Sequence, residues 1–242
     1  MFARTLVGLD GSAASETALA TTITLTRAFG STIVLGMINM REDAALSRAE
    51  SRVKAAGLAV ETIVATGLVP DMLLALADDA EALSIGRRGR GPGSGVIGEE
   101  TGRIMRRSPK PLLIGGEHPS PCRAPLVAYD GGETSSHALT LAARYATVTK
   151  VIVEVVHVDD GLGPSDELLA RAGAYCSGLG VEYTTHRLQG QASEAILAHS
   201  TARGIDLVLT GAHSGRRRRS WSIGRGAESL VRQAHLPVIV VR

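Results

Sequence analysis

Apolar residues fall into short continuous runs, and these alternate with longer segments in which apolar positions recur at helical spacing. The run at 207–209 carries no polar residue, as is typical of a strand buried on both faces of a parallel sheet. The runs predict strands at residues 5–9, 32–37, 58–65, 82–85, 112–114, 126–129, 151–158, 181–188, 207–210 and 238–241. The segments between them predict helices at residues 13–29, 41–56, 71–79, 99–107, 135–147, 165–177, 193–203 and 227–233. This alternation predicts an α/β fold with helices on both faces of a mainly parallel sheet.

The same order of elements occurs twice along the chain. Residues 6–12 read LVGLDGS and residues 126–132 read LVAYDGG, and each half ends on an apolar strand that follows proline. The copies begin about 120 residues apart, so they predict two domains rather than the short units of a repeat array. We expect two tandem Rossmann-like domains, each an open five-stranded sheet, with a proline-rich linker between them. The first domain, the linker and the second domain are expected at residues 1–117, 118–125 and 126–242.

Composition removes several classes of protein. Aromatic residues make up 3% of the chain, which leaves few platforms on which the bases of single-stranded nucleic acid could stack. The net charge of +2 is too small to indicate a nucleic-acid-binding protein. The arginine run at 216–219 with Trp221 could attract nucleic acid or an acidic partner, but such runs are more often solvated loops. We therefore expect no nucleic-acid partner.

The cysteines and the N-terminal residues predict a location. Cys122 and Cys176 show neither metal-ligand spacing nor a disulfide framework, which favours a reducing compartment. Residues 1–4 lead into the first strand without the apolar core of a signal peptide, and no apolar run approaches membrane-spanning length. We expect a cytoplasmic protein without a membrane partner.

A glycine-rich segment follows the fourth strand of each half. The first contains Gly86, Gly89 and Gly98, and the second begins at Gly211 and ends at Gly224. Glycines let backbone amides approach an anion, and the helix that follows presents its positive N-terminal end. Arginines at 87, 88 and 90 and the run at 216–219 make both segments basic, which favours anion binding. The alternative is a flexible loop that needs glycine only for tight turns.

A second glycine pattern suggests a different ligand. Gly93-x-Gly95-x-x-Gly98 has the form of a dinucleotide fingerprint, and Glu117 lies at a suitable distance beyond it. That fingerprint directly follows a strand, whereas residues 87–92 separate this one from the strand at 82–85, and the second half has no counterpart. We expect no dinucleotide site here.

The strand–Asp–Gly turn, the glycine-rich loop and the terminal strand after Pro237 resemble the universal stress protein family in its tandem two-domain form, over essentially the whole chain. The resemblance implies a stress-response regulatory or binding module. In the ATP-binding branch of that family, a Gly-x2-Gly-x9-Gly-[Ser/Thr] loop holds the phosphates. The aspartate after the first strand and an apolar residue of the second strand hold the adenosine.

The two halves depart from that loop pattern in different ways. In the first, Gly98 comes one residue early and Glu99 takes the hydroxyl position, where its carboxylate opposes a phosphate. In the second, Gly211 and Gly224 keep the span and Arg225 takes the hydroxyl position, where its charge suits a phosphate. The resemblance thus implies an ATP site, with or without Mg²⁺, that is more complete in the second half. The implied residues are Asp130, Gly131, Val158, Thr210, Gly211, Ser214, Gly215, Gly224 and Arg225, and in the first half Asp10, Met37, Gly86, Gly89 and Gly98.

Other functions stay open at this point. Neither half offers a positioned base or nucleophile, so we expect no catalytic residues and at most weak ATP hydrolysis. The seven histidines show no metal-ligand spacing along the chain. Glu99 and Arg225 also suit a nucleotide-free structural or interaction protein of the same family. The resemblance further implies that the strands at 112–114 and 238–241 pair to form a pseudo-dimer within one chain, and two such chains could then form a homodimer.

Overall fold

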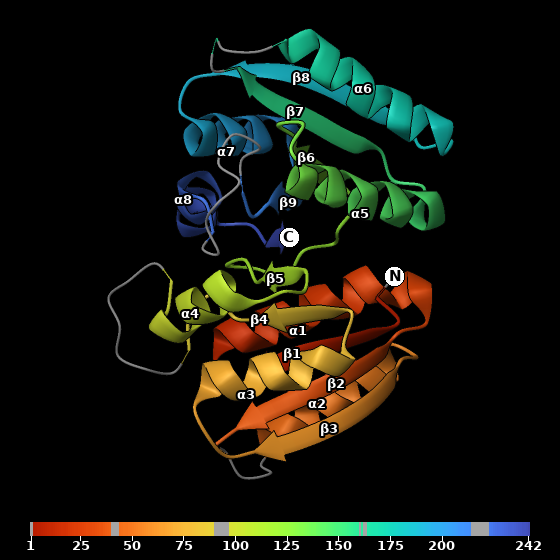
Figure 1. Cartoon of the computed structure of the whole chain (residues 1–242). Coiled ribbons are helices and arrows are strands. Elements are labelled where there is room, and N and C mark those ends of the chain that lie inside the picture. Colours follow the sequence, from red (N-terminus) through yellow and green to blue (C-terminus); the bar gives the residue numbers. More distant parts are fainter. Residues whose placement is uncertain (1, 40–43, 90–96, 160, 162–163, 214–222) are drawn as a thin grey trace. The chain divides into compact units, whose positions relative to one another are not determined.

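The structure is a computed structural model that describes residues 2–39, 44–89, 97–159, 161, 164–213 and 223–242. The chain divides into two compact units, Met1–Pro121 and Cys122–Arg242 (Figure 1). The boundary between the units falls inside the segment 118–125, where the sequence places a linker. The implied pairing of the strands at 112–114 and 238–241 stays a prediction.

The first unit is a parallel sheet with helices on both faces. Its strands lie in the order β3-β2-β1-β4-β5, and the described pairs are parallel. Its elements are β1 (Arg4–Leu9), α1 (Ala13–Thr26), η1 (Arg27–Phe29), β2 (Thr32–Ile38), α2 (Ala44–Ala55), β3 (Ala59–Ala65), α3 (Val69–Leu76), η2 (Ala77–Asp79), β4 (Ala82–Ile85), α4 (Glu99–Arg107) and β5 (Leu112–Ile114).

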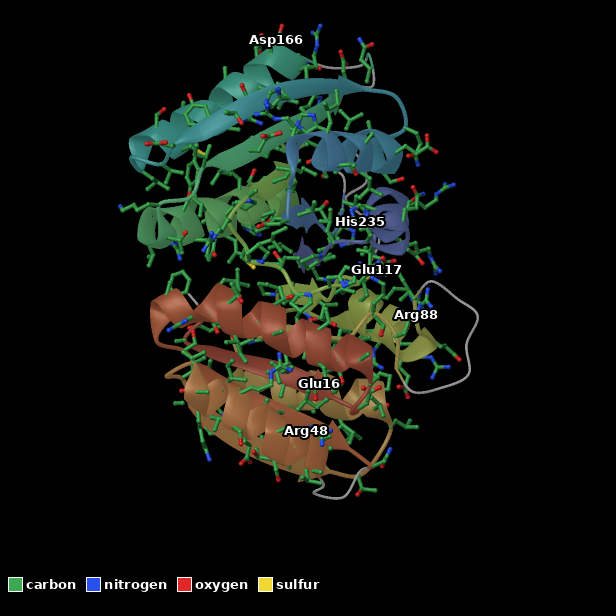
Figure 2. The ribbon with its side chains drawn as sticks, turned by 180° about the vertical axis from the view of Figure 1, so that it is seen from behind. Glu16, Arg48, Arg88, Glu117, Asp166 and His235 are labelled. Atoms are coloured by element: carbon green, nitrogen blue, oxygen red, sulfur yellow. The ribbon has the colours of Figure 1, made fainter. Side chains whose placement is uncertain are left out.

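On each face of the sheet of the first unit, two helices are joined by an ion pair. Arg52 of α2 forms an ion pair with Glu16 of α1, at 2.6 Å between Nη1 and Oε2. Arg107 of α4 pairs with Asp71 of α3 at 2.5 Å. Figure 1 shows α3 and α4 on one face of the sheet, and Figure 2, from behind, shows α1 and α2 on the other. Both faces of the sheet are therefore covered, which accounts for its apolar strands.

The second unit repeats this architecture. Its strands lie in the order β8-β7-β6-β9-β10, and the described pairs are again parallel. Tyr175 Oη of α6 donates to Thr140 Oγ1 of α5 at 3.1 Å, and the hydroxyls of Ser193 in α7 and Ser229 in α8 lie 3.0 Å apart. Its elements are β6 (Pro125–Ala128), α5 (Glu133–Thr149), β7 (Val153–Asp159), α6 (Ser165–Gly178), β8 (Tyr183–Gln189), α7 (Ala192–Arg203), β9 (Leu207–Gly211), α8 (Arg225–Gln233) and β10 (Val238–Val241).

Sequence signals mark the element ends. Ser12 caps α1 by accepting a hydrogen bond from the Ser15 amide, and Gly30 ends the following 3-10 turn in the left-handed region at φ 60°. Strands β7 and β8 begin two residues later than predicted, at Val153 and Tyr183. The predicted start of the helix at 41–56 lies outside the described residues. No helix in the described part of the chain is both long and apolar enough to span a bilayer.

Chain reversals in the sheets define where a ligand could bind. In the first unit the chain runs outward from β1 through β2 to β3 and then returns to β4, on the other side of β1. In the second unit the same reversal lies between β6 and β9. Ligands of open α/β sheets bind beyond the carboxyl ends of the strands at such switch points. The Asp–Gly turns follow β1 and β6, and the glycine-rich loops follow β4 and β9, so these segments flank the switch points.

Candidate nucleotide site

The turn after β1 is held by its own aspartate. Asp10 Oδ1 accepts hydrogen bonds from the Ser12 amide at 3.0 Å and from the Ser12 hydroxyl at 2.6 Å. Gly11 lies in the left-handed region at φ 69°, which glycine adopts without a steric cost. A Cβ at Gly89 would lie 3.1 Å from Asp10 Oδ2, so the start of the glycine-rich loop sits against this carboxylate. The structure thus brings together Asp10 and Gly89, two of the predicted site residues.

The turn after β6 has the same geometry. Asp130 Oδ1 accepts from the Gly132 amide at 2.9 Å and from the Ser135 hydroxyl at 2.6 Å. Gly131 lies at φ 76°. Because both units use this side chain to close the turn, an aspartate here has a structural role whether or not a ligand binds.

Helix α6 lies directly against the Asp130–Gly131 turn. Arg171 Nη2 donates to the Gly131 carbonyl at 3.5 Å. A Cβ at Gly131 would lie 2.4 Å from Leu168 Cδ2 and 2.7 Å from Arg171 Nη2. The exposed guanidinium of Arg171 therefore lies beside the turn that follows β6.

The first glycine of each loop is required by packing. A Cβ at Gly86 would lie 2.8 Å from the Ser15 amide nitrogen, and a Cβ at Gly211 would lie 2.6 Å from the Ser135 amide nitrogen. The ends of β4 and β9 thus approach the first turns of α1 and α5 more closely than any side chain allows. Thr210 is buried, and its Oγ1 donates to the Gly211 carbonyl at 3.3 Å.

A backbone hydrogen bond closes each loop at its base. The Gly98 amide donates to the Arg87 carbonyl at 3.0 Å, and the Gly224 amide donates to the Ala212 carbonyl at 2.7 Å. Gly98 and Gly224 are the N-cap residues of α4 and α8, and neither offers a capping side chain. Neither N-cap residue therefore satisfies the amides of the first helical turn through a side chain, an arrangement suited to an anion.

The first residues of α4 and α8 carry opposite charges. Glu99 is exposed and forms an ion pair with Arg103, one turn further along α4. Arg225 occupies the same position of α8 and is also exposed. Negative charge at a helix N-terminus is stabilising and positive charge is unfavourable, by about 0.3–1 kcal/mol at an exposed site. The loop of the first unit thus presents a carboxylate, and that of the second unit presents a guanidinium.

The two residues implied to hold adenosine differ in exposure. Met37 is fully buried in the core beneath α1 and α2, so its side chain is not available to a ligand. Val158, near the end of β7, is only half-buried. The residues 90–96 and 214–222 lie outside the described part of the chain, and with them Gly93, Gly95, Ser214, Gly215 and the arginine run at 216–219.

The chain has relatives among known proteins. Residues 162–242 match the universal stress protein family. Over 209 residues the chain is 28% identical to universal stress protein Slr1230 of Synechocystis, a match that covers 81% of this chain and 70% of that protein. The second unit thus matches the universal stress protein family, and the chain as a whole is similar to a member of that family.

Solved structures of this family extend the likeness to the whole chain. A universal stress protein of Archaeoglobus fulgidus matches with a TM-score of 0.80 and 19% identity, covering 100% of this chain and 99% of the other. A putative universal stress protein of Pseudomonas aeruginosa matches with a TM-score of 0.74 and 20% identity, covering 99% and 93%. At these identities the likeness establishes the fold. Both units share it, so the chain has the fold of a tandem universal stress protein.

One basic residue of the first unit is not where the sequence suggested. Arg87 was expected to make its loop basic, but its side chain is buried and its Nε donates to the Gly115 carbonyl at 3.2 Å. Burial lowers the pKa of Arg87, an effect that the charge of Glu117 partly opposes. The guanidinium ties the end of β4 to the residue after β5, and a repeated basic pattern in the sequence could not reveal this.

A threonine that the sequence did not single out holds the loop of the second unit. Thr134 Oγ1, in the first turn of α5, donates to the His213 carbonyl at 2.9 Å and lies 3.3 Å from the His213 amide, which donates to it. Burial lowers the pKa of His213, and the nearby charge of Arg242 lowers it further. The neutral imidazole is thereby favoured beside the switch point.

Proposed function

We propose that this chain is a tandem universal stress protein that binds an adenine nucleotide, ATP, in its second unit and acts as a stress-linked binding or regulatory module. The observation that carries the proposal is the N-terminus of α8. It lacks a capping side chain and begins with an exposed arginine, Arg225, where the first unit has Glu99. Without a ligand, the positive charge of an arginine is unfavourable at the positive N-terminal end of a helix. A phosphate bound there would interact favourably with both the arginine and the helix.

The neighbouring groups suit the rest of the ligand. Asp130 follows β6 and Gly224 closes the loop after β9, so they flank the switch point at which α/β sheets bind nucleotides. Arg171 adds a second cation beside Gly131. The half-buried Val158 offers apolar surface near the end of β7. These groups could bind phosphate on one side of the switch point and the adenosine part on the other.

We propose binding without efficient turnover. Asp130 is an acidic residue at this site, and its Oδ1 already accepts two hydrogen bonds that close the turn. A carboxylate committed to its own turn is poorly placed to take a proton from water or substrate. If phosphate release above the buffer rate were found and Arg225→Glu abolished it, the protein would be a weak ATPase instead.

Thermal denaturation of the full chain with increasing ATP and Mg²⁺ tests the proposal. Binding to the native state should stabilise the protein by about 2.7 kcal/mol when ATP exceeds its Kd 100-fold. Arg225→Glu should weaken binding roughly tenfold or more, because a hydrogen bond between charged groups contributes about 1.5–3 kcal/mol. The matched control is Arg232→Glu, which reverses the charge of an exposed arginine in the last turn of the same helix and should leave the affinity unchanged.

A nucleotide-free scaffold is the second candidate, and one observation favours it. The aspartate turns and the first glycines of both loops have packing roles that need no ligand. If millimolar ATP produced no stabilisation, this candidate would replace the first. Equal loss of affinity in the two charge variants would instead show that Arg225 does not define the site.

A further inference from the structure

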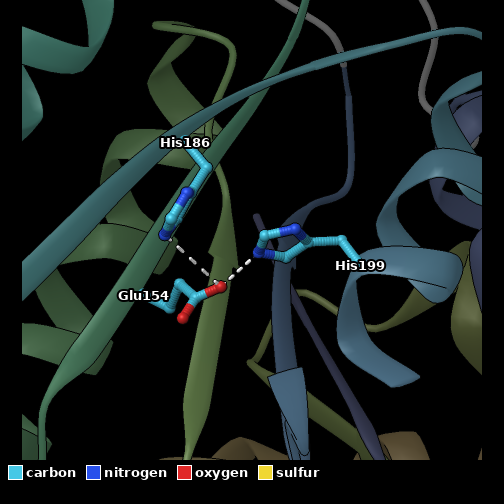
Figure 3. A group of neighbouring side chains, drawn as sticks. All are labelled: Glu154, His186 and His199. Atoms are coloured by element: carbon cyan, nitrogen blue, oxygen red, sulfur yellow. Dashed lines mark hydrogen bonds and ion pairs between the residues drawn. The ribbon is translucent and has the colours of Figure 1, made fainter. Parts of the chain in front are cut away.

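Three side chains of the second unit meet on the face of the sheet that α7 covers. Glu154 comes from β7, His186 from β8 and His199 from α7, and their ligand atoms lie within 4.8 Å of one another (Figure 3). His199 Nε2 and Glu154 Oε1 form a hydrogen bond, and His186 Nε2 lies 3.9 Å from the same oxygen. Two imidazole nitrogens thus converge on one carboxylate oxygen.

The burial of this cluster is unusual for charged groups. The side chain of Glu154 is 9% exposed, and that of His199 is 13% exposed. His186 Nε2 is buried and has no hydrogen-bond partner among the described residues, although its ring is 35% exposed. An unsatisfied buried nitrogen is costly for a fold, and a metal ion is one partner that would satisfy it.

The first unit provides an internal control. Counted by strand register from the aspartate turns, Val34 occupies the position of Glu154, and Ile63 occupies that of His186. The same fold is therefore built with apolar residues at these places. The architecture does not require the polar cluster, which is specific to the second unit.

We propose that Glu154, His186 and His199 bind a divalent transition-metal ion, with Zn²⁺ as the ion to test. Two histidines and one carboxylate are a set that Zn²⁺ accepts, with a fourth position left to water. In a tetrahedral site with bonds of about 2.0–2.2 Å, ligand atoms lie about 3.4 Å apart. The site therefore forms if His199 and Glu154 move apart and His186 moves slightly inward, which side-chain rotation can provide.

The alternative is an ion-pair network without metal. Glu154 Oε2 lies 3.4 Å from Arg203 Nε and 3.5 Å from Thr184 Oγ1, so the second carboxylate oxygen already has polar neighbours. Both contacts involve Oε2, so Oε1 is left for the metal. They also orient the carboxylate, as residues that hydrogen-bond to a metal ligand do in known sites. The two interpretations differ at His186, because its Nε2 makes no hydrogen bond that a network would lose.

Titration of chelator-treated full-length protein with Zn²⁺ tests the site, with heat or a chromogenic competitor as the readout. We expect one Zn²⁺ per chain. Mutation of a residue that only hydrogen-bonds to a metal ligand lowers metal affinity roughly 10–100-fold. Loss of a ligand should cost more, so His186→Gln and His199→Gln should each weaken binding at least about 100-fold. Co²⁺ should give visible absorption bands of a low-coordinate site, and His186→Gln should remove them.

His235→Gln is the matched control, because His235 is an exposed histidine of the same unit outside the cluster. It should bind Zn²⁺ as the unchanged protein does. His186→Gln removes no hydrogen bond at Nε2 and should stay folded, which circular dichroism checks. The proposal is overturned if the unchanged protein fails to bind one Zn²⁺, or if His186→Gln binds it with unchanged affinity.

Discussion

Close contacts with the first turns of α1 and α5 explain why the strands β4 and β9 are each followed or ended by glycine. At Gly211 a Cβ would lie 2.4 Å from Thr134 Oγ1 and 2.6 Å from the Ser135 amide nitrogen. A Cβ at Gly86 would likewise lie 2.8 Å from the Ser15 amide nitrogen. The neighbouring atoms are largely backbone, which cannot rotate aside. These glycines therefore allow the sheet to approach the first turn of a helix, a requirement independent of any phosphate.

Gly211→Ala should therefore destabilise the protein. Overpacking of a close contact costs about 1–3 kcal/mol, and urea unfolding monitored by circular dichroism measures the loss. Gly226→Ala is the matched control, because a Cβ at Gly226 of α8 would meet no described atom within 4 Å beyond its own stretch of helix. There alanine should be neutral or stabilise by up to about 1 kcal/mol. Equal stability of the two variants would contradict the packing role.

At the scale of elements, the segment that leads into β6 is fastened at two points. Asp206 accepts hydrogen bonds from the amides of Arg123, at 2.8 Å, and Ala124, at 3.0 Å. Tyr145 of α5 donates its hydroxyl to the Cys122 carbonyl at 2.9 Å. Burial is the main cause that raises the pKa of Tyr145, and the nearby Cys122 and Asp206 raise it further. The folded unit thus keeps this phenol neutral.

Tyr145→Phe should cost about 0.5–1.5 kcal/mol near neutral pH, because it removes the buried hydrogen bond from the phenol to the Cys122 carbonyl. The folded pKa lies above the unfolded value of about 10, so the tyrosine's contribution is fully present below pH 10 and is lost as the pH rises toward the folded value. The difference in unfolding free energy between the two proteins should therefore narrow above pH 10. Tyr175→Phe, at an exposed tyrosine, is the control. A difference that stays constant to pH 11 would contradict the assignment.

Much of the element pattern could be predicted from the sequence, because its signals are local. Ser12 caps α1, Gly30 and Gly204 end helical segments in the left-handed region, and the apolar run at 207–209 is the core of β9. Helix α5 begins two residues earlier than predicted, at Glu133, because Gly132 caps it directly after the aspartate turn.

The candidate sites were predictable only in part, because they depend on contacts between distant elements. Spacing along the chain brings Asp130 and Gly211 to one end of the sheet, but it does not show that Arg87 turns inward to Gly115. Nor does it bring His186 and His199 to Glu154, since each comes from a different element. The available signal was Glu154 itself, a carboxylate in the buried part of β7 with apolar neighbours in Val153, Val155 and Val156.

At the scale of the whole molecule, duplication separates what the fold needs from what one unit has gained. Both units share the strand order, the aspartate turn and the hydrogen bond that closes the loop. They differ at Glu99 and Arg225, and in the charged cluster around Glu154, whose register equivalent is Val34. We therefore assign both proposed ligands to the second unit and a structural role to the first.

This asymmetry predicts that the chain binds one ATP rather than two. Isothermal titration of the full chain should give one site per chain, because Glu99 opposes phosphate at the loop of the first unit. Arg225→Glu should weaken that site. His186→Gln should leave it unchanged, because His186 lies within β8 and the proposed ATP site lies beyond the carboxyl ends of β6 and β9. Two sites of equal affinity would show that the units are equivalent and that Glu99 does not prevent binding.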